Sequence, residues 1–276
     1  MMKNNRVGFI GGGNMTRAIA GGLLASGVPG STIAIADPSA KQRERLADEV
    51  PGAQITDDNS SVAAEVNCLV LATKPQVLAD VCRGLAATVQ ASKPLIVSIA
   101  AGIRSIDIDA WLGGGLAVVR VMPNQPALLR LGVSALFAND RVSADDRELA
   151  ATIMTSVGKV VSVPMEADID AATAISGSGP AYFYLLIDML VTTAKTLGLD
   201  EQTARALAIE TAVGAAALAA DSDEKMDELI TRVRSPGGTT AAALDSLERQ
   251  DVRDIFATAM TAARDRATEL ADEAGQ

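Results

Sequence analysis

The sequence contains no histidine. This absence excludes Ser-His-Asp hydrolysis, histidine general acid–base catalysis and any zinc site that needs a histidine ligand. An enzyme built from this chain must therefore move protons with lysine, carboxylate, tyrosine, serine or threonine side chains, or take them from water.

Cysteine and positive charge are both scarce. Cys68 and Cys82 are the only cysteines, their spacing fits no metal site, and no disulfide framework is expected, which favours a reducing, cytoplasmic environment. Against 34 Asp and Glu there are 24 Lys and Arg, so the net charge is −10. This balance argues against nucleic acid and anionic membranes as partners.

Long apolar runs are also lacking. No stretch approaches the roughly 20 apolar residues of a transmembrane helix, so no membrane span is expected. The apolar run at 7–10 is too short for a signal peptide, and Asn14, Thr16 and Arg17 follow it at once. The 276 residues, 49% of them hydrophobic, suffice for one large domain or two ordinary ones.

Strand-like and helix-like segments alternate through the first part of the chain. Short apolar runs, most of them followed by Gly, Pro, Asp or Lys, predict strands at 6–10, 32–36, 68–72, 95–100, 116–121, 133–138 and 159–163. Between them, helical patterns begin near Met15 and cover 41–50, 77–85 and 106–112. This alternation predicts a parallel, doubly wound sheet, and strands that are apolar almost throughout, such as 95–99, fit burial on both faces.

The pattern changes near Pro164, and from Ala167 onward no strand is expected. Apolar residues follow helical spacing over 183–194, 203–220, 241–249 and 252–271. Some of these helices are apolar over most of their circumference and are too few to bury one another. We therefore predict an α/β domain over 1–163 and an all-helical dimerisation domain over 164–276.

A glycine-rich turn connects the first predicted strand to the first helix. Gly11-Gly12-Gly13-Asn14-Met15-Thr16 fits the G-x-G-x-x pattern, with Thr16 where a third Gly or Ala is usual. The first glycine permits the turn, the second lets a pyrophosphate approach the backbone, and the helix N-terminus supplies N–H groups. In this strand–turn–helix context the motif predicts a dinucleotide site rather than a turn without a ligand.

The end of the second strand bears on the choice of coenzyme. Asp37 occupies the position that usually binds the adenosine ribose hydroxyls, which favours NAD and would repel a 2′-phosphate. Ser39, Lys41 and Arg43 follow directly and could hold that phosphate, although a solvated helix face is the plain alternative. On the residues alone, the choice between the two coenzymes stays open.

Three further strand ends, at 73–75, 100–102 and 122–124, meet the same predicted edge of the sheet. Ligands of doubly wound sheets bind outside the carboxyl ends of the strands. Lys74 stands where a nicotinamide ring could lie, although a surface lysine before a helix is the alternative. Arg120, inside a strand, is expected to form a structural ion pair, and Glu166, as an isolated acid, to lie on the surface.

Two glycine-rich runs interrupt the helical part. The run 235–240, Ser-Pro-Gly-Gly-Thr-Thr, breaks one helix and opens another, so its unpaired N–H groups and hydroxyls offer a site for a carboxylate. A helix–helix loop with an ordinary N-cap is the alternative. The run 174–183 contains Pro180 at a predicted helix start, and its small residues allow either close approach of a ligand or close packing alone.

Taken together, these motifs resemble those of the pyrroline-5-carboxylate reductases over nearly the whole chain. The segments that carry the resemblance are 7–15, 72–75, 97–102, 120–124, 176–182 (Ser-Gly-Ser-Gly-Pro-Ala-Tyr) and 235–240. The last two, in this order behind a dinucleotide-binding half, are the most specific. Gln125 stands where Thr is usual and Thr73 where Val is common, but neither change removes a group assigned to chemistry.

The resemblance implies a Rossmann domain followed by a helical dimerisation domain, in interlocked homodimers that commonly assemble into decamers. It implies reduction of 1-pyrroline-5-carboxylate to L-proline, the last step of proline biosynthesis, with NADPH preferred and NADH also accepted. It implies no metal site.

The resemblance also assigns site residues. The coenzyme contacts fall on Ile10, Gly11, Gly12, Gly13, Asn14, Met15, Asp37, Asn59, Thr73, Lys74, Pro75, Ala100 and Ala101. The substrate contacts fall on Glu166, Ser235, Gly238, Thr239 and Thr240, with the 235–240 loop on the substrate carboxylate. Thr240, facing the ring nitrogen, and Lys74, at the nicotinamide end, are the candidate catalytic residues.

Two alternatives remain beside this interpretation. A β-hydroxyacid dehydrogenase shares the two-domain plan but places a lysine of the second domain beside the substrate, for which Lys195 is the one plausible candidate. A nucleotide-binding regulator without catalysis would bind the coenzyme but would not turn over. An assay of coenzyme oxidation with pyrroline-5-carboxylate distinguishes these possibilities.

Overall fold

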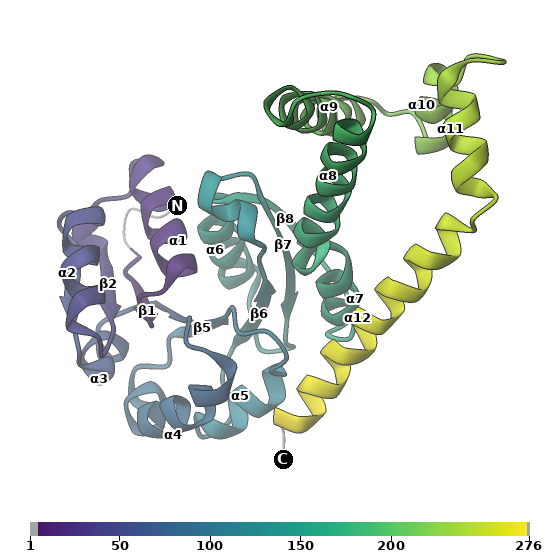
Figure 1. Ribbon diagram of the computed structural model, residues 1–276. Helices are drawn as coiled ribbons and strands as arrows, with labels where there is room; N and C mark the ends of the chain where they lie inside the picture. The colour runs from purple at the N-terminus through teal and green to yellow at the C-terminus, as the bar shows by residue number, and fades with distance from the viewer. Residues whose placement is uncertain (1–4, 275–276) are drawn as a thin grey trace. The chain divides into compact units, whose positions relative to one another are not determined.

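The computed structural model describes residues 5–274 and divides into two compact units (Figure 1). The first unit comprises the chain up to Ser178 together with the residues from Ala263 on, and the second comprises Gly179–Ala262. Residues 164–178 and 263–274 therefore pack with the sheet, although the sequence analysis assigned them to the helical domain. The functional domains 1–163 and 164–276 stay a prediction, because compactness alone does not define them.

The first unit is built on one eight-stranded sheet with the order β3-β2-β1-β4-β5-β6-β7-β8. The strands are β1 Val7–Ile10, β2 Ile33–Ala36, β3 Gln54–Thr56, β4 Cys68–Leu71, β5 Leu95–Ser98, β6 Val118–Met122, β7 Gly132–Ala138 and β8 Gly158–Ser162. The first six run parallel, as predicted, and their order reverses direction at β1, which is the doubly wound arrangement.

The last two strands depart from the predicted parallel sheet. β7 pairs antiparallel with β6, with Arg120 opposite Phe137, and β8 then runs parallel to β7. Only residues 123–131 separate β6 from β7, and much of that segment is the 3₁₀ turn η3 Gln125–Leu129. A parallel return needs a crossover of about a dozen residues or more, so this short connection forces the chain to double back.

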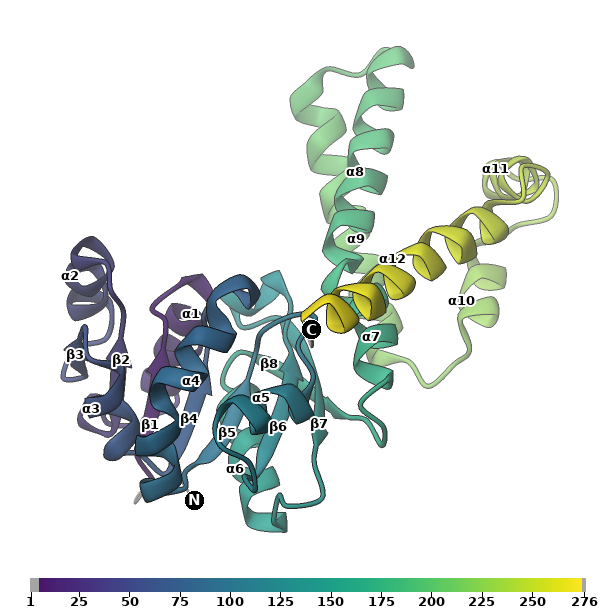
Figure 2. The same cartoon turned by 90° about the horizontal axis from the view of Figure 1, so that it is seen from below.

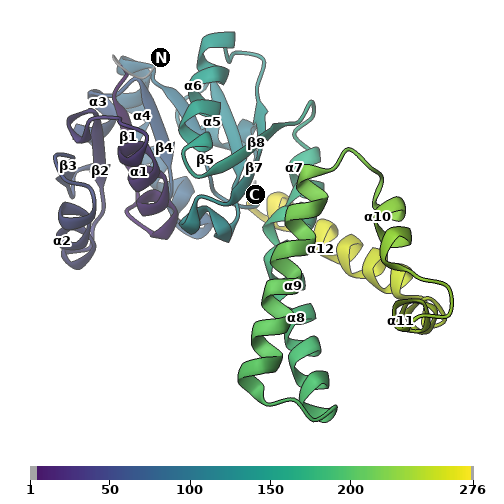
Figure 3. The same cartoon turned by 90° about the horizontal axis from the view of Figure 1, so that it is seen from above.

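Helices cover both faces of the sheet, because successive strand residues point to opposite sides. On one face, Val7, Phe9 and Val97 pack with α1 Asn14–Ala25 and α6 Ala144–Thr155. On the other, Ile10, Leu69 and Ile96 pack with α3 Asn59–Ala64, α4 Pro75–Ser92 and α5 Ser105–Trp111. Figure 2 shows α4 and α5 in front of the strands, and Figure 3, from the opposite side, shows α1 and α6 there.

Local sequence signals explain where several of these helices begin. Ser39 accepts a hydrogen bond from Gln42 N at the start of α2 Ala40–Glu49, and Ser143 accepts one from Asp146 N at the start of α6. Pro75 opens α4, where its missing N–H is not needed. The sequence analysis did not anticipate β3, α3 or α6, of which the first two are only 3 and 6 residues long.

Both cysteines are free and buried, one on each side of the sheet. Burial raises the pKa of the Cys82 thiol to about 12, and it raises the pKa of Cys68 further still. Thiols held protonated in an apolar core are poor nucleophiles, so neither is a candidate for chemistry.

The first helix of this part begins before Pro180, where the sequence predicted a helix start. α7 Asp168–Ala172 is followed by the π-helical turn η4 Thr173–Gly177, in which Ser178 N donates to Thr173 O at 2.8 Å, and α8 Gly179–Thr196 comes next. The helical pattern thus precedes Pro180 by several residues. A Cβ built on Gly177 would lie 2.8 Å from the Met122 Cε, so this glycine lies close to β6.

The second unit is helical throughout, and the described residues from 167 onward contain no strand, as predicted. Its helices are α8, α9 Glu201–Asp221, α10 Met226–Val233, α11 Thr239–Glu248 and the first half of α12 Val252–Ala274. Many large apolar side chains of these helices are exposed, among them Phe183, Leu190, Leu207, Val213 and Phe256. Such a surface requires a partner of some kind.

Two helical stretches of this part, Asp168–Thr196 and Glu201–Asp221, are long and apolar enough to cross a membrane by length and composition alone. No membrane span was expected from the sequence, because polar residues interrupt both apolar stretches. One or two such helices are weak evidence for a membrane, since helices that a partner chain covers have the same composition.

Candidate active site

The glycine-rich turn after β1 is shaped for close approach. Gly11 has a φ of +101°, and a Cβ built on it would lie 2.8 Å from Ala72 O. A Cβ on Gly12 would lie 2.5 Å from Leu46 Cδ1, whereas one on Gly13 would meet nothing within 4 Å. Gly13 is the N-cap of α1, and no side chain caps the helix. The first N–H groups of α1 are therefore open to an anion.

Three side chains hold this turn in place. Asp37 Oδ2 accepts from Gly12 N at 2.7 Å, and its Oδ1 accepts from Ser39 N at 2.8 Å. Gln42 Nε2 donates to Gly12 O at 3.2 Å, and the buried hydroxyl of Thr16 donates to Gly11 O at 2.5 Å. Thr16, which departs from the usual glycine pattern, thus braces the turn. No sequence signal pointed to Gln42.

The residues expected to meet a 2′-phosphate are partly engaged elsewhere. Arg43 Nη1 donates to Asp37 O at 2.9 Å and to Pro38 O at 3.0 Å, and its Nη2 pairs with Asp57 at 3.5 Å. Lys41 is exposed and forms no ion pair with the described residues. Arg43 therefore stiffens the loop that carries Asp37, and Lys41 is the more available cation.

The other predicted coenzyme residues lie at the ends of neighbouring parallel strands, so they share one edge of the sheet. Thr73 follows β4, and its buried hydroxyl has no hydrogen-bond partner in the described part of the chain. Lys74, an exposed residue, is the N-cap of α4. Ala100 and Ala101 follow β5, and Asn59, half-buried, begins α3.

This edge of the sheet fits a dinucleotide. It combines an uncapped helix N-terminus, a glycine that any side chain would crowd, and an unpaired buried hydroxyl at Thr73. The first two suit a pyrophosphate, and a ligand can satisfy the third. The structure brings all the predicted coenzyme residues into one unit and onto this edge.

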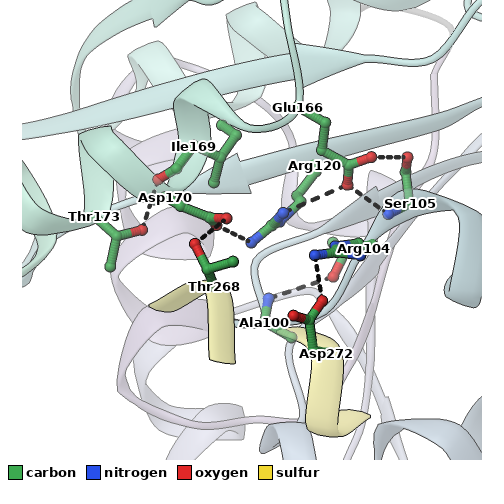
Figure 4. Close-up of polar contacts among 11 residues, drawn as sticks. Ala100, Arg104, Ser105, Arg120, Glu166, Ile169, Asp170, Thr173, Thr268 and Asp272 are labelled. Carbon is green, nitrogen blue, oxygen red and sulfur yellow. Dashed lines mark hydrogen bonds and ion pairs between the residues drawn. The ribbon is translucent and has the colours of Figure 1, made fainter. Parts of the chain in front are cut away.

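A buried charge cluster lies beside the same edge (Figure 4). Arg120 of β6, whose side chain is 3% exposed, pairs with Glu166 at 3.4 Å and with Asp170 of α7 at 3.3 Å. Glu166 also accepts from Ser105 N at 2.6 Å and from Ser105 Oγ at 2.7 Å. The predicted ion pair of Arg120 is confirmed, and the expectation that Glu166 is an isolated surface acid is wrong.

The cluster reaches the C-terminal end of α12. Thr268 donates to Asp170 Oδ2 at 3.3 Å, and Arg104 pairs with Asp272 at 2.5 Å. Burial raises the pKa of Asp107 in the first turn of α5; the Arg104 charge opposes this shift and the Glu166 charge adds to it. These contacts hold the start of α5 against two segments that are distant in sequence.

The predicted carboxylate site lies in the second unit. Gly237 has a φ of +70°, Gly238 N donates to Ser235 O at 3.0 Å, and Gly238 is the N-cap of α11. No side chain caps α11, and its first turn holds no acid. Thr240, half-buried, is the second residue of the helix. This geometry suits an anion at the N-terminus of a ten-residue helix.

The lysine that the β-hydroxyacid dehydrogenase alternative requires is engaged differently. Lys195 lies at the end of α8 and pairs with Glu201 at 2.7 Å, and both side chains are exposed. This pair spans the connection between α8 and α9 at the surface, which is the ordinary role of such a residue.

A doubly wound sheet with this glycine turn defines the class of nicotinamide-dependent oxidoreductases. Residues 6–102 match the family model "NADP oxidoreductase coenzyme F420-dependent", and residues 166–270 match "Pyrroline-5-carboxylate reductase dimerisation". The chain is 44% identical over 275 residues to the pyrroline-5-carboxylate reductase of Pseudomonas aeruginosa, with 100% of both chains covered. The chain belongs to the pyrroline-5-carboxylate reductase family.

Solved structures agree with this assignment. A pyrroline-5-carboxylate reductase from Coxiella burnetii is 39% identical, with a TM-score of 0.93, covering 97% of this chain and 99% of that one. The Plasmodium falciparum pyrroline carboxylate reductase, solved with NADP bound, is 28% identical with a TM-score of 0.86, covering 98% and 100%.

The match to the dimerisation model accounts for the exposed apolar helices. It spans 166–270, which includes both stretches that could cross a membrane by composition. Oligomerisation therefore explains their apolar surface, and the helices do not indicate a membrane.

Proposed function

We propose that this protein reduces 1-pyrroline-5-carboxylate to L-proline in the cytoplasm, as the last step of proline biosynthesis. The observation that carries the proposal is the uncapped N-terminus of α11 behind the Ser235–Gly238 turn, in a chain that also has the dinucleotide turn. A carboxylate is the one charged group of this substrate that a helix N-terminus attracts. The named relatives support the same activity.

The protein contributes chiefly placement to the reaction. A reduced nicotinamide coenzyme, when bound, supplies the hydride that the imine carbon accepts. Residues 10–15, Asp37, Asn59 and 73–75 hold the coenzyme, with Lys74 and the Ala100–Ala101 pair at its nicotinamide end. Ser235, Gly238 and Thr239 hold the substrate carboxylate. Thr240 directs its hydroxyl at the imine nitrogen.

The imine nitrogen must gain one proton as the carbon gains the hydride. The chain has no histidine to supply it. We consider two sources: the substrate binds as the iminium ion, or the Thr240 hydroxyl passes on a proton from water. In both cases Thr240 contacts the nitrogen. Its replacement is therefore the sharpest test of the assigned site.

The activity itself is tested by following oxidation of NADPH with pyrroline-5-carboxylate as the second substrate. The expected result is turnover that yields one proline per coenzyme oxidised. Oxidation of a 3-hydroxy acid with oxidised coenzyme, in place of this reaction, would assign the chain to the rival class. Coenzyme binding without any turnover would contradict the proposed function and favour a regulator.

For the coenzyme, we expect turnover with both NADPH and NADH and a modest preference for NADPH. Lys41 is exposed beside the ribose position and attracts a 2′-phosphate, whereas Asp37 repels it. Replacing Asp37→Ser should raise the NADPH to NADH ratio of kcat/KM by roughly fivefold, the value of about 1 kcal/mol for an exposed charge pair.

Asp37 also holds the N–H of Gly12, so the coenzyme comparison needs a control. Asp37→Asn removes the charge but keeps one acceptor oxygen, and it should shift the ratio in the same direction with less loss of overall affinity. A clear preference of the parent protein for NADH would show that Asp37 outweighs Lys41.

For assembly, we propose homodimers that associate further into decamers. α10, α11 and α12 line an apolar groove of about 500 Å³ that includes Ile230, Leu247 and Phe256, and Phe256 is 47% exposed. Burying such side chains against a second chain contributes roughly 1.5–3 kcal/mol each, so an isolated monomer should be unstable.

Light scattering after size exclusion measures the assembly. Phe256→Asp should shift the protein toward smaller species. Ile106→Asp should not, although Ile106 is 70% exposed, because it lies outside the segment matched by the dimerisation model. A folded, active monomer at low micromolar concentration would refute the interlocked dimer.

A further inference from the structure

The segment between β5 and α5 is the part of the coenzyme edge with the least regular structure. Residues 99–104 lead from Ser98 to Ser105 and carry Ala100 and Ala101, to which the nicotinamide end of the coenzyme is assigned. Gly102 has a φ of +68°, and a Cβ there would lie 3.1 Å from Leu270 Cβ. The β-ladder fixes the near end of the segment. At its far end, the pair of Arg104 with Asp272 is half-exposed and contributes little, so a more buried anchor is needed.

Glu166 supplies that anchor from outside the segment. Its Oε1 accepts from Ser105 N at 2.6 Å and its Oε2 from Ser105 Oγ at 2.7 Å (Figure 4). Oε1 also meets Arg120 at 3.4 Å, and the Glu166 side chain is 22% exposed. Both carboxylate oxygens therefore have partners within the protein.

Arg120 forms ion pairs with two carboxylates, those of Glu166 and Asp170. It lies between Glu166 and Asp170 at nearly equal distances, 3.4 and 3.3 Å. Asp170 contacts Thr268 of α12, whereas Glu166 contacts Ser105 at the end of the β5–α5 segment. The two acids thus share the role of neutralising Arg120. Glu166 alone of the two also holds the segment.

We propose that Glu166 is a positioning residue, which acts through Ser105 to keep the β5–α5 segment in the conformation that receives the nicotinamide end of the coenzyme. This role differs from the substrate contact that the family resemblance implies for Glu166. The inference rests on the proposed function, because that function assigns Ala100 and Ala101 to the coenzyme. An anchored segment has less conformational freedom to lose when the ligand binds.

Matched substitutions of the two acids that pair with Arg120 distinguish a positioning role from charge balance. Glu166→Gln and Asp170→Asn each leave Arg120 with one carboxylate, so a purely structural role predicts similar effects for the two variants. If Glu166 positions the segment, Glu166→Gln raises the Kd and KM for NADPH roughly tenfold, because it replaces one acceptor oxygen by an NH2 group and removes the charge that strengthens both contacts to Ser105. Asp170→Asn should leave both constants within about twofold of the parent.

The single tryptophan provides a direct spectroscopic readout. Trp111 is the last residue of α5, the helix that Ser105 begins, and the Arg83 guanidinium lies 5.9 Å from the centre of its ring. Loosening the start of α5 should shift Trp111 emission and weaken its energy transfer to bound NADPH. Glu166→Gln should show both changes in the fully assembled protein, and Asp170→Asn neither.

Ser105→Ala is the second variant, and it removes only the hydroxyl contact. It should raise the Kd for NADPH less than Glu166→Gln does, and Ser105→Thr, which keeps the hydroxyl, should restore it. In the double variant the two effects should not add, because both act through one contact. Equal effects of Glu166→Gln and Asp170→Asn, or no effect of Glu166→Gln and Ser105→Ala on NADPH binding, would overturn the proposal.

Direct titration of NADPH keeps this test independent of the reaction. If the parent protein binds NADPH but does not reduce pyrroline-5-carboxylate, the proposed function is wrong, and the Kd values of the variants for NADPH still test the positioning role. If the parent protein is active and the variants bind NADPH as tightly as it does, only the positioning role is wrong.

Discussion

Replacing Thr240 with alanine should lower kcat/KM for pyrroline-5-carboxylate roughly 10- to 100-fold, because a hydrogen bond to a charged group contributes about 1.5–3 kcal/mol. Thr240 is the second residue of α11, in the turn whose free N–H groups are assigned to the substrate carboxylate. Under the proposed function, its hydroxyl contacts the imine nitrogen. Steady-state kinetics with varied pyrroline-5-carboxylate measure the loss.

The fold and the coenzyme site should survive this substitution. Loss of a hydroxyl near a helix N-terminus costs only about 0.5–2 kcal/mol, and the Kd for NADPH should barely change because the coenzyme residues belong to the other compact unit. Thr240→Ser should recover most of the activity. Thr231→Ala is the matched control, since its hydroxyl donates to Asp227 O within α10 of the same unit.

Parent-like turnover by Thr240→Ala would show that the assigned contact to nitrogen is wrong. The proton would then arrive with the substrate as the iminium ion, and the 235–240 turn would serve only to hold the carboxylate. A loss of activity together with a large rise in the Kd for NADPH would instead indicate that the substitution disturbs more than the substrate side.

The coenzyme turn could be predicted from the sequence because its determinants are local. Gly11 needs a positive φ, Gly12 has no room for a Cβ, and Asp37 follows the neighbouring strand of a parallel pair. Each of these residues lies within a few positions of the end of a strand. The same holds for the 235–240 turn, where the glycines and the following helix pattern are adjacent.

Glu166 could not be placed in this way. Its partners Ser105 and Arg120 lie 61 and 46 residues away, and no spacing rule connects an acid after β8 with the start of α5. The contact forms because β8 lies two strands from β6 in the sheet, so that Glu166, after β8, meets Arg120 of β6 and Ser105 of α5. Arg120 was a better candidate for an ion pair, since a charge inside a buried strand requires a partner.

The direction of β7 illustrates a second limit. Apolar content identified the strand, but apolar content is the same for either direction. The length of the connection 123–131 carried the missing information, because it is too short for a parallel crossover. The π-helical turn at Thr173–Gly177 had no comparable signal, since its glycine and serine residues are equally typical of a loop.

Among the substitutions considered, the removal of Arg120 should lower the free energy of unfolding the most. Arg120→Met keeps much of the side chain's length but leaves Glu166 and Asp170 without their shared cation, and Asp170 is only 9% exposed. Breaking a buried ion pair from one side costs about 3–5 kcal/mol. We therefore expect the thermal midpoint to fall by roughly 10 °C, given about 2–4 °C per kcal/mol for chains of this order of size.

Arg104→Met is the matched control for this stability measurement. Arg104 pairs with Asp272 at the edge of the same cluster, but both side chains are about half exposed. An exposed pair contributes about 0–1 kcal/mol, so the control should move the midpoint by only a few degrees. Because oligomers gain stability with concentration, the variants must be compared at equal protein concentration and without coenzyme.

If Arg120 acts through its charge, one further result is expected that a simple loss of packing does not predict. In the parent, Asp170→Asn should destabilise the fold, because it removes one of the partners of Arg120. In the Arg120→Met background the same change should stabilise it, because it removes a buried carboxylate that has lost its cation. This reversal of sign, read from thermal midpoints of the four proteins, tests the ion pair itself. If Asp170→Asn destabilises both backgrounds alike, Arg120 contributes to the fold mainly through packing.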